Sequence, residues 1–476
     1  MNPSMRDLSA IAPLLIVAGT GIVAVLADSV VKRGRSLSPV LAVAGLAAAI
    51  AFSLPALGDP AASAAFGGMV RTGAFTSYLT LVFCVSGLLS VLLSMSYIDE
   101  MIPERGEYYA LILFAVSGMI LMASAWDLVV FFLGLELMSL SFYILAGFAR
   151  GRMTSNEAAL KYFLLGAFAT GFLLYGIALV YGATGSTSLA GFPARTGGLH
   201  QPLLLLAGLA LLMIGLMFKV GSVPFHMWVP DVYEGAPTTV TAFMSTGGKA
   251  AAFSGFLIIF APPVLIAQPA LRDVLAVVAA TSMVAGNIIA LAQTSVKRML
   301  AYSSIAHAGY ILSGVVAANP AGSNGVLFYL MTYTMMNAGA FGVVSLLEKV
   351  DGSMLTFDEC AGLSRRSPLV AALSAVFMFS LAGVPPLAGF FGKYYVFAGA
   401  VEAHYTWLAI VGVLMSVVSA YYYLRLVVVM YFNDNPGGVS PAARPLGLAA
   451  VIIAAIALTG FGVFPSILLG LGARCF

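Results

Sequence analysis

Four charged residues lie deep inside long apolar stretches of the chain: Glu136, Lys219, Lys249 and Lys393. A lysine at the centre of a bilayer costs roughly 3 kcal/mol on insertion scales, so a charge at that depth usually serves a function. Burial disfavours a charged amine and a nearby carboxylate favours it, so a buried lysine can hold or release a proton according to its neighbour. These residue types therefore predict proton transfer within a membrane.

Three further residues are secondary candidates for the same path. Lys161 follows Glu157 by four residues near the end of its apolar stretch, where it could equally be an anchor that reaches the membrane surface. His226 follows Lys219 by seven residues, and His307 lies within the segment YSSIAHAGYIL. Histidine titrates close to physiological pH and suits a relay between lysines. Both histidines could instead be hydrogen-bonded packing residues.

The composition defines the class of protein that holds these charges. Of the 476 residues, 61% are hydrophobic and only 9% are charged, whereas a soluble domain carries about 25% charged residues. The chain is therefore a polytopic membrane protein. Its net charge of +3, without a basic run, argues against nucleic acid as a partner. Cys84, Cys360 and Cys475 are isolated and no nucleotide fingerprint is present, so we expect no metal or cofactor site on this chain.

Hydropathy divides the chain into about fourteen apolar spans, each close to the length that a bilayer requires of a helix. They lie near residues 8–30, 39–57, 75–97, 108–124, 127–149, 156–182, 202–222, 237–262, 270–293, 299–318, 324–348, 368–402, 406–432 and 445–470. Glycine and proline interrupt the seventh span at Gly221–Pro224 and the twelfth at Gly383–Pro386, so both are predicted to be broken helices. Backbone groups freed by such breaks survive at membrane depth only where protein or water satisfies them.

The positions of the two breaks predict an internal repeat. Five spans separate them, and an odd shift turns the second copy upside down in the membrane. Broken helices at matching positions of inverted repeats usually mark an ion pathway. We therefore expect an all-α polytopic protein in four parts. These are three N-terminal helices in 1–107, a first five-helix repeat (helices 4–8) in 108–262, a second inverted repeat (helices 9–13) in 270–432, and helix 14 in 445–476.

The distribution of lysine and arginine predicts the orientation. These residues concentrate in one set of alternating loops, which is expected to face the cytoplasm. With an even number of spans, both termini then lie on the outer side of the membrane. Tyrosine and tryptophan residues near span ends are expected to form an interfacial belt.

Several segments resemble the antiporter-like membrane subunits of respiratory complex I, a family related to the multisubunit cation/proton antiporters. The resemblance covers nearly the whole chain. It is most specific in FFLGLELMSL, EAALKYFLLGA, FKVGSVPFHMWVPDVYEGAPTTVTAFMSTGGKAA, QTSVKRMLAYSSIAHAGY and GVPPLAGFFGKYY. The family implies fourteen helices, two inverted five-helix repeats with broken helices seven and twelve, and a proton path along the membrane midplane.

The resemblance also implies roles for single residues. Glu136 would partner Lys219 in one half-channel, Lys249 would connect, and Lys393 would serve the other half-channel. Lys161 and His307 match further positions of the same axis, and His226 is a secondary candidate.

As a family member, the chain would be a proton-translocating subunit of an NADH–quinone oxidoreductase in the inner membrane of a bacterium. Its partners would be the other membrane-arm subunits, including adjacent antiporter-like and small membrane subunits, and the lipid bilayer. NADH, FMN, iron–sulfur clusters and quinone are expected in partner subunits. The largest of the three homologous subunits has a long C-terminal lateral helix, and the middle one carries a glutamate where this chain has Lys393. The homologue at the quinone-side end of the arm therefore fits best.

Two alternatives remain. The chain could belong to a multisubunit cation (Na⁺)/proton antiporter without a redox partner, although sodium fits less well because oxygen ligands are scarce in the membrane. It could also be a structural scaffold whose buried charges only specify packing.

Overall fold

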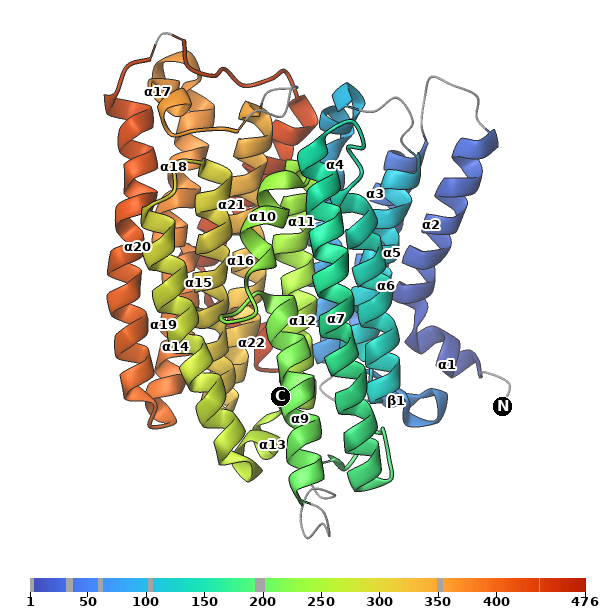
Figure 1. The fold of residues 1–476 in the computed structure, drawn as a ribbon. Helices are drawn as coiled ribbons and strands as arrows, with labels where there is room; N and C mark the ends of the chain where they lie inside the picture. The colour runs from blue at the N-terminus through green and yellow to red at the C-terminus, as the bar shows by residue number, and fades with distance from the viewer. Residues whose placement is uncertain are drawn as a thin grey trace.

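The computed structural model describes residues 4–30, 37–58, 63–101, 106–192, 202–348, 354–435 and 437–476 as a bundle of long helices (Figure 1). Within these residues, thirteen helices are long and apolar enough to cross a membrane. One further span is divided into the shorter helices α18 (Pro368–Ala382) and α19 (Ala388–Glu402). The prediction of an all-α polytopic membrane protein with about fourteen spans is confirmed.

The N-terminal part combines three spans with a small β-hairpin. The hairpin was not predicted, and it joins the second span to the third, with Ser63 opposite Thr72. Asp7 accepts a hydrogen bond of 2.8 Å from the backbone nitrogen of Phe66, which ties the hairpin to the first helix. The elements are α1 (Met5–Ala10), α2 (Ala12–Val30), α3 (Ser38–Ser53), η1 (Pro55–Gly58), β1 (Ser63–Ala65), η2 (Phe66–Gly68), β2 (Val70–Thr72) and α4 (Ala74–Met101).

The next five spans correspond to the first predicted repeat. The fourth of them is broken as expected, because α9 ends at Val220 and α10 begins at Trp228. The fifth contains one turn of π-helix, η3, directly before Lys249. The elements are α5 (Gly106–Ser124), α6 (Leu128–Ala146), α7 (Met153–Thr184), α9 (Pro202–Val220), α10 (Trp228–Gly235), α11 (Thr238–Phe243), η3 (Met244–Gly248) and α12 (Lys249–Ile259).

The second group of five spans has its break in the same fourth position, between α18 and α19. Gly383 adopts a left-handed φ of 90° at this break, which confirms the predicted interruption at Gly383–Pro386. The other four spans of this group are α14 (Pro269–Leu291), α15 (Val296–Ala317), α16 (Pro320–Leu347) and α20 (Thr406–Phe432). Short helices connect the spans: α13 (Pro262–Ala267), η4 (Asp358–Cys360) and α17 (Leu363–Arg366). The last span, α21 (Pro445–Val463), and the short helix α22 (Ser466–Gly472) follow the group.

The two broken spans run in opposite directions. In Figure 1, α9 rises toward α10, whereas α18 begins beside α17 at the top and descends into α19. The first two helices of each group also pack through glycine. A Cβ atom on Gly118 of α5 would lie 2.5 Å from the backbone nitrogen of Met138, and one on Gly286 of α14 would lie 2.6 Å from that of Ala306. These features support an inverted repeat, while the boundaries 108–262 and 270–432 remain predictions.

The spans at the centre of the bundle carry several of the candidate residues. The spans Thr238–Ile259 and Pro320–Leu347 are 100% buried and Val296–Ala317 is 94% buried, whereas Ala12–Ser29 at the edge is only 17% buried. We call the end where α6 joins α7 the inner end, because its lysines and arginines predict the cytoplasmic side. The opposite, outer end holds both α1 and the C-terminus (Figure 1).

Candidate functional site

The break after α9 places Lys219 at a helix end inside the bundle. Gly221 adopts a left-handed φ of 71° and ends the helix. The freed carbonyls are satisfied locally, because Trp228 Nε1 donates to the oxygen of Phe218 at 2.9 Å and the backbone nitrogen of Ser222 donates to that of Met217 at 3.0 Å. Lys219 occupies the last turn of α9, where the helix dipole favours a cation.

The amine of Lys219 binds hydroxyl groups. Its Nζ atom donates to Ser139 Oγ at 2.7 Å and to Tyr143 Oη at 3.2 Å, and it lies 5.3 Å from the centre of the Tyr143 ring. Both partners come from α6, the helix that carries Glu136. Lys219 itself is only 6% exposed.

Glu136 and Lys219 are not in direct contact in this structure. Oε1 of Glu136 is buried without a hydrogen-bond partner, and the ion pairs formed by the described residues do not include Glu136. Ser139 lies one turn beyond Glu136 on α6, about 4.5 Å in helix rise. It accepts the hydrogen bond of the Lys219 amine in place of the carboxylate. The direct pair that the family resemblance implies is therefore absent from this arrangement, and Glu136 lies one helical turn from the serine that binds the amine.

Lys249 binds one serine through two atoms. Its Nζ donates to both the carbonyl oxygen and the hydroxyl oxygen of Ser304, each at 2.5 Å. The amine also lies 5.8 Å from the centre of the Tyr333 ring. Lys249 is 2% exposed, so these groups replace the water that a charged amine would otherwise hold.

His307 lies on the same helix as Ser304, one turn further along α15. Its Nδ1 atom is 2.7 Å from Tyr329 Oη and its Nε2 atom is 3.2 Å from Tyr423 Oη. The imidazole ring centre lies 5.4 Å from that of Tyr310. Both ring nitrogens are therefore occupied by tyrosine hydroxyls, which can each donate or accept a proton.

Lys393 reaches the break of the second group. Its Nζ donates at 2.9 Å to the carbonyl of Ala382, the last residue of α18, and lies 4.8 Å from the centre of the Tyr310 ring. A Cβ atom on Gly383 would lie 3.2 Å from Cδ of Lys393. Glycine at the break thus makes room for the lysine, and the carbonyl end of α18 favours its positive charge.

These residues follow one another along α15 and its neighbours. Lys249 contacts Ser304, His307 contacts Tyr310, and Tyr310 contacts Lys393. Ser304 and His307 are three residues apart on α15, which places them on one face of the helix. We call these five residues the central chain.

Lys219 stands apart from the central chain. The ring of Tyr162 on α7 stacks on that of Trp228 on α10, with 4.5 Å between their centres, and Tyr233 meets Trp228 edge-on at 6.0 Å. Of the contacts in the described part of the chain, none joins Lys219 directly to Lys249.

Buried tyrosines surround the charged side chains. These tyrosines lie within the spans, so the expectation that tyrosines near span ends form an interfacial belt does not concern them and stays a prediction. An aromatic face attracts a cation and a phenol hydroxyl can satisfy a buried amine, so these residues compensate the buried charge. The set consists of Tyr143, Tyr162, Tyr310, Tyr329, Tyr333 and Tyr423.

Two of the secondary candidates lie away from the buried amines. Lys161 is half-exposed toward the inner end and forms ion pairs with Glu157 at 2.7 Å and Asp231 at 2.8 Å. This geometry fits the surface-anchor interpretation. His226 lies in the break after α9, and its Nδ1 atom is buried without a hydrogen-bond partner.

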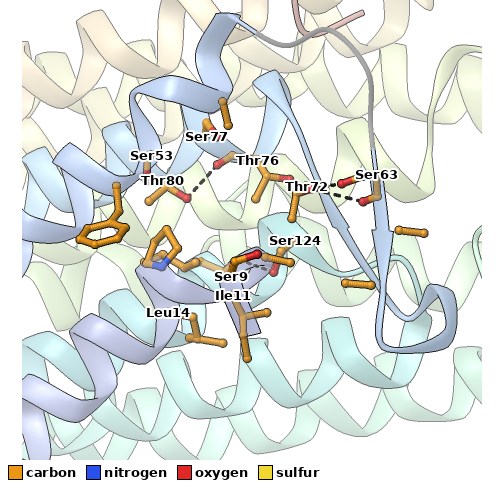
Figure 2. Close-up of a pocket in the computed structure, with 17 residues that line it drawn as sticks. Ser9, Ile11, Leu14, Ser53, Ser63, Thr72, Thr76, Ser77, Thr80 and Ser124 are labelled. Atoms are coloured by element: carbon orange, nitrogen blue, oxygen red, sulfur yellow. Dashed lines mark hydrogen bonds between the residues drawn. The ribbon is translucent and has the colours of Figure 1, made fainter. Parts of the chain in front are cut away.

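A cavity of about 260 Å³ lies at the outer end (Figure 2). Hydroxyl and apolar side chains line it, and none of the described residues in its lining is charged. Thr80 and Ser124 donate to the carbonyls of Thr76 and Ile120 in their own helices, at 2.8 and 2.9 Å. The cavity has no group that titrates near neutral pH, so it is not the candidate site.

Sequence reasoning missed Glu348, which caps the inner end of α16. Its carboxylate accepts hydrogen bonds from Tyr97, at 2.7 Å, and from Thr238, and pairs with Arg152 at 3.2 Å. Burial alone would raise the pKa of Glu348, but the positive charge of Lys297 and these donors hold it below its usual value. The partners are far apart in the sequence, so no spacing reveals the cluster.

Comparisons with known proteins agree with this architecture. Residues 125–419 match the transmembrane family described as NADH:quinone oxidoreductase/Mrp antiporter. The chain is 45% identical to NADH-quinone oxidoreductase subunit N 1 of Chloroherpeton thalassium, over 98% of this chain and 97% of that protein. A chain of respiratory complex I from Thermus thermophilus with bound aureothin superposes with a TM-score of 0.83 at 38% identity, covering 97% of this chain and 99% of that one. A chain of the Mrp complex from Dietzia sp. DQ12-45-1b superposes with a TM-score of 0.85 at 22% identity, covering 98% and 97%.

The fold and the matched region first define a class. The chain belongs to the transmembrane family that NADH:quinone oxidoreductases share with Mrp antiporters. Within that family it belongs with the subunit N proteins of NADH-quinone oxidoreductase, and so it is a subunit of a multisubunit membrane complex. The antiporter alternative is less supported, because the Mrp likeness at 22% identity concerns the fold alone.

Proposed function

We propose that this subunit translocates protons across the membrane as part of NADH-quinone oxidoreductase. The observation that carries the proposal is the central chain, in which two buried amines and an imidazole are linked by hydroxyl and ring contacts. Lys249, His307 and Lys393 are 2%, 1% and 5% exposed, so protons that they exchange stay inside the protein. Intramembrane ionisable residues of this kind mark proton relays in pumps and transporters.

The chemistry of the central chain follows from its partners. The ammonium group of Lys249 donates to the Ser304 hydroxyl, which can pass its own proton onward. His307 accepts a proton on one ring nitrogen and releases one from the other, because a tyrosine hydroxyl lies at each. Lys393 receives the proton at the carbonyl end of α18, where a cation is favoured.

Glu136 and Lys219 would act as the gate of the first half. When the Glu136 carboxylate moves toward the amine, it favours the protonated lysine, and when it withdraws, it favours release. The present contacts of Lys219, which are with Ser139 and Tyr143, correspond to the withdrawn arrangement. Transfer from Lys219 to Lys249 then requires water to bridge them, because no hydrogen bond in the described residues joins the two lysines.

The proposal extends to the surroundings of the subunit. Electron transfer from NADH through FMN and iron–sulfur clusters to quinone takes place in partner subunits and drives the charge changes felt here. The chain contacts adjacent antiporter-like and small membrane subunits and the lipid bilayer. It lies in the inner membrane of a bacterium, with both termini on the outer side.

The test is Lys393→Met in the complete complex. Methionine keeps the length of the side chain and removes the amine. We expect NADH-driven proton pumping to fall while the complex remains intact on a native gel. Arg365→Met is the control, because Arg365 is 74% exposed and pairs with Asp434 at the surface. Full pumping by the Lys393 variant would refute the proposal, and loss of the whole complex would favour a scaffold.

A further inference from the structure

A line of buried hydroxyl groups joins α4 to α11 and η3. On α4 the residues are Tyr97, Ser94, Ser90 and Ser86, whose spacing of three to four puts them on one face of the helix. Opposite them, on α11 and η3, are Thr238, Thr239 and Thr246. None of these seven residues is more than 1% exposed. We call the seven residues, together with Tyr108 of α5, the hydroxyl seam.

The inner end of the seam contacts a carboxylate. Tyr97 donates to Glu348 at 2.7 Å, and the Thr238 hydroxyl donates to the same oxygen. The backbone nitrogen of Thr238 donates to Tyr97 Oη at 3.1 Å, which closes this group. Arg152 and Lys297 hold Glu348 ionised.

The middle of the seam is a chain of three hydroxyls. Tyr108 Oη lies 3.0 Å from Thr239 Oγ1 and 2.9 Å from Ser94 Oγ. Ser94 and Ser90 then donate to the backbone carbonyls of Ser90 and Ser86, at 2.7 and 2.8 Å. The hydroxyls therefore descend along α4 toward the centre of the membrane.

The seam ends at the π-helical turn before Lys249. Ser86 Oγ lies 2.7 Å from Thr246 Oγ1 and accepts from the backbone nitrogen of Gly247 at 3.0 Å. Thr246 lies within this turn, which ends directly before Lys249, so the seam reaches the segment that carries the lysine. Single π-helical turns inside α-helices are frequent at functional sites.

Two interpretations of the seam can be separated. Hydroxyls between membrane helices often serve only as interhelical hydrogen bonds. This seam has a carboxylate at one end and a lysine of the central chain at the other, and every member can both donate and accept a proton. Buried serines elsewhere in the described bundle, such as Ser117 and Ser254, also donate to carbonyls of their own helices, at 2.8 and 2.6 Å. What distinguishes the seam is the set of contacts between hydroxyls of different helices.

We infer that the hydroxyl seam is the route by which protons from the inner end reach Lys249, with Glu348 as the loading carboxylate. This inference rests on the proposed function. A proton taken from inner water by Glu348 passes to the Tyr97–Thr238 pair, and each hydroxyl accepts one proton while it releases its own to the next. The neutral amine of Lys249 takes the last proton, and Glu348 returns to the carboxylate form. The steps from Ser94 to Ser90 and from Ser90 to Ser86 each span about 6 Å of helix. In the described residues no hydrogen bond joins the Tyr97–Thr238 pair to Thr239 and Tyr108, or Thr246 to Lys249. A transient water molecule therefore closes each of these four steps.

The sharpest test is Ser90→Ala in the complete complex, reconstituted in proteoliposomes. Ser117→Ala is the matched control, because both serines are buried and both donate to a carbonyl of their own helix, at 2.8 Å. A packing role predicts the same result for the two variants. The relay predicts that only Ser90→Ala slows coupled NADH oxidation and pumping, by about tenfold, equivalent to about 1.4 kcal/mol in the barrier. It also predicts a larger solvent isotope effect in that variant alone. Equal rates and isotope effects in the two variants overturn the inference.

A second pair of variants covers the middle of the seam. Tyr108→Phe removes the hydroxyl that joins Ser94 to Thr239, and Tyr78→Phe is its control, since Tyr78 donates only to the carbonyl of Leu327. We expect the same slowing for Tyr108→Phe only, and equal rates would again overturn the relay. Lys249→Met is measured in parallel. If it abolishes pumping while both seam variants behave as their controls, the seam inference fails and the proposed function stands. If Lys249→Met pumps normally, the proposed function itself fails.

Discussion

Replacing Lys249 with methionine separates proton transfer from structural support. Methionine is apolar and of similar length, so the substitution removes the amine and leaves little empty space. A lysine at the bilayer centre costs roughly 3 kcal/mol. The two hydrogen bonds from Lys249 to Ser304, both 2.5 Å long, each stabilise the folded protein by about 1.5–3 kcal/mol, because the donor is charged. Methionine also leaves the Ser304 oxygens without this donor.

These opposing contributions partly cancel. Two such bonds stabilise the lysine by about 3–6 kcal/mol in total against a cost of about 3 kcal/mol, so we expect Lys249→Met to lower the unfolding free energy by no more than about 3 kcal/mol. For a chain of this length, that difference shifts Tm by only a few degrees, since about 2–4 °C per kcal/mol applies to smaller proteins. Proton pumping should fall by at least tenfold, because the central chain loses its first amine.

The assay combines a native gel and thermal unfolding with NADH-driven acidification of vesicles. An intact complex with almost unchanged Tm and lost pumping supports the account. A scaffold predicts the reverse pattern, with loss of assembly or a large drop in Tm. Full pumping in an intact complex would refute the reasoning for this residue.

Three other predictions follow from single contacts. Gly383→Ala should reduce pumping more than Gly185→Ala, because both glycines have a left-handed φ but only at Gly383 would the added Cβ press on Lys393, at 3.2 Å from its Cδ atom. Equal loss of pumping in the two variants would show that backbone strain, about 1–2 kcal/mol, is the whole effect. Glu136→Gln should impair pumping with less harm to assembly than Glu136→Ala, because glutamine keeps the shape of the side chain; full pumping in both would reject the gate. Because its folded-state pKa is lowered, Glu348 stabilises the protein above its unfolded pKa of about 4.3, and this contribution is lost as the pH falls further. Thermal unfolding of Glu348→Gln should therefore start from a lower Tm at pH 7 and decline less on acidification than the wild type, and parallel curves would contradict the assignment.

The architecture could be predicted from the sequence because membrane spans depend on local composition. A run of apolar residues of bilayer length identifies a helix wherever it occurs, and Gly221–Pro224 and Gly383–Pro386 identify the breaks for equally local reasons. The hairpin Ser63–Thr72 was missed, since its strands are only three residues long and carry no clear alternation.

The charged residues were also found locally, but their partners were not. An isolated lysine in an apolar helix is visible in the sequence, whereas its contacts depend on which helices face it. Ser304 and Ser139 lie far from Lys249 and Lys219 along the chain. Glu348 falls at the end of the predicted span 324–348 and was not singled out, because burial by other helices leaves no trace in its own segment.

The most direct test of the account is the number of protons translocated per NADH oxidised by the complex with Lys219→Ala, after a native gel has confirmed assembly. Lys219 is the buried amine of the first half, and its contacts with Ser139 and Tyr143 leave it free of any direct carboxylate pair. The account predicts an intact complex with reduced proton translocation and reduced coupled turnover. An intact complex that translocates the wild-type number of protons at the wild-type rate would contradict it.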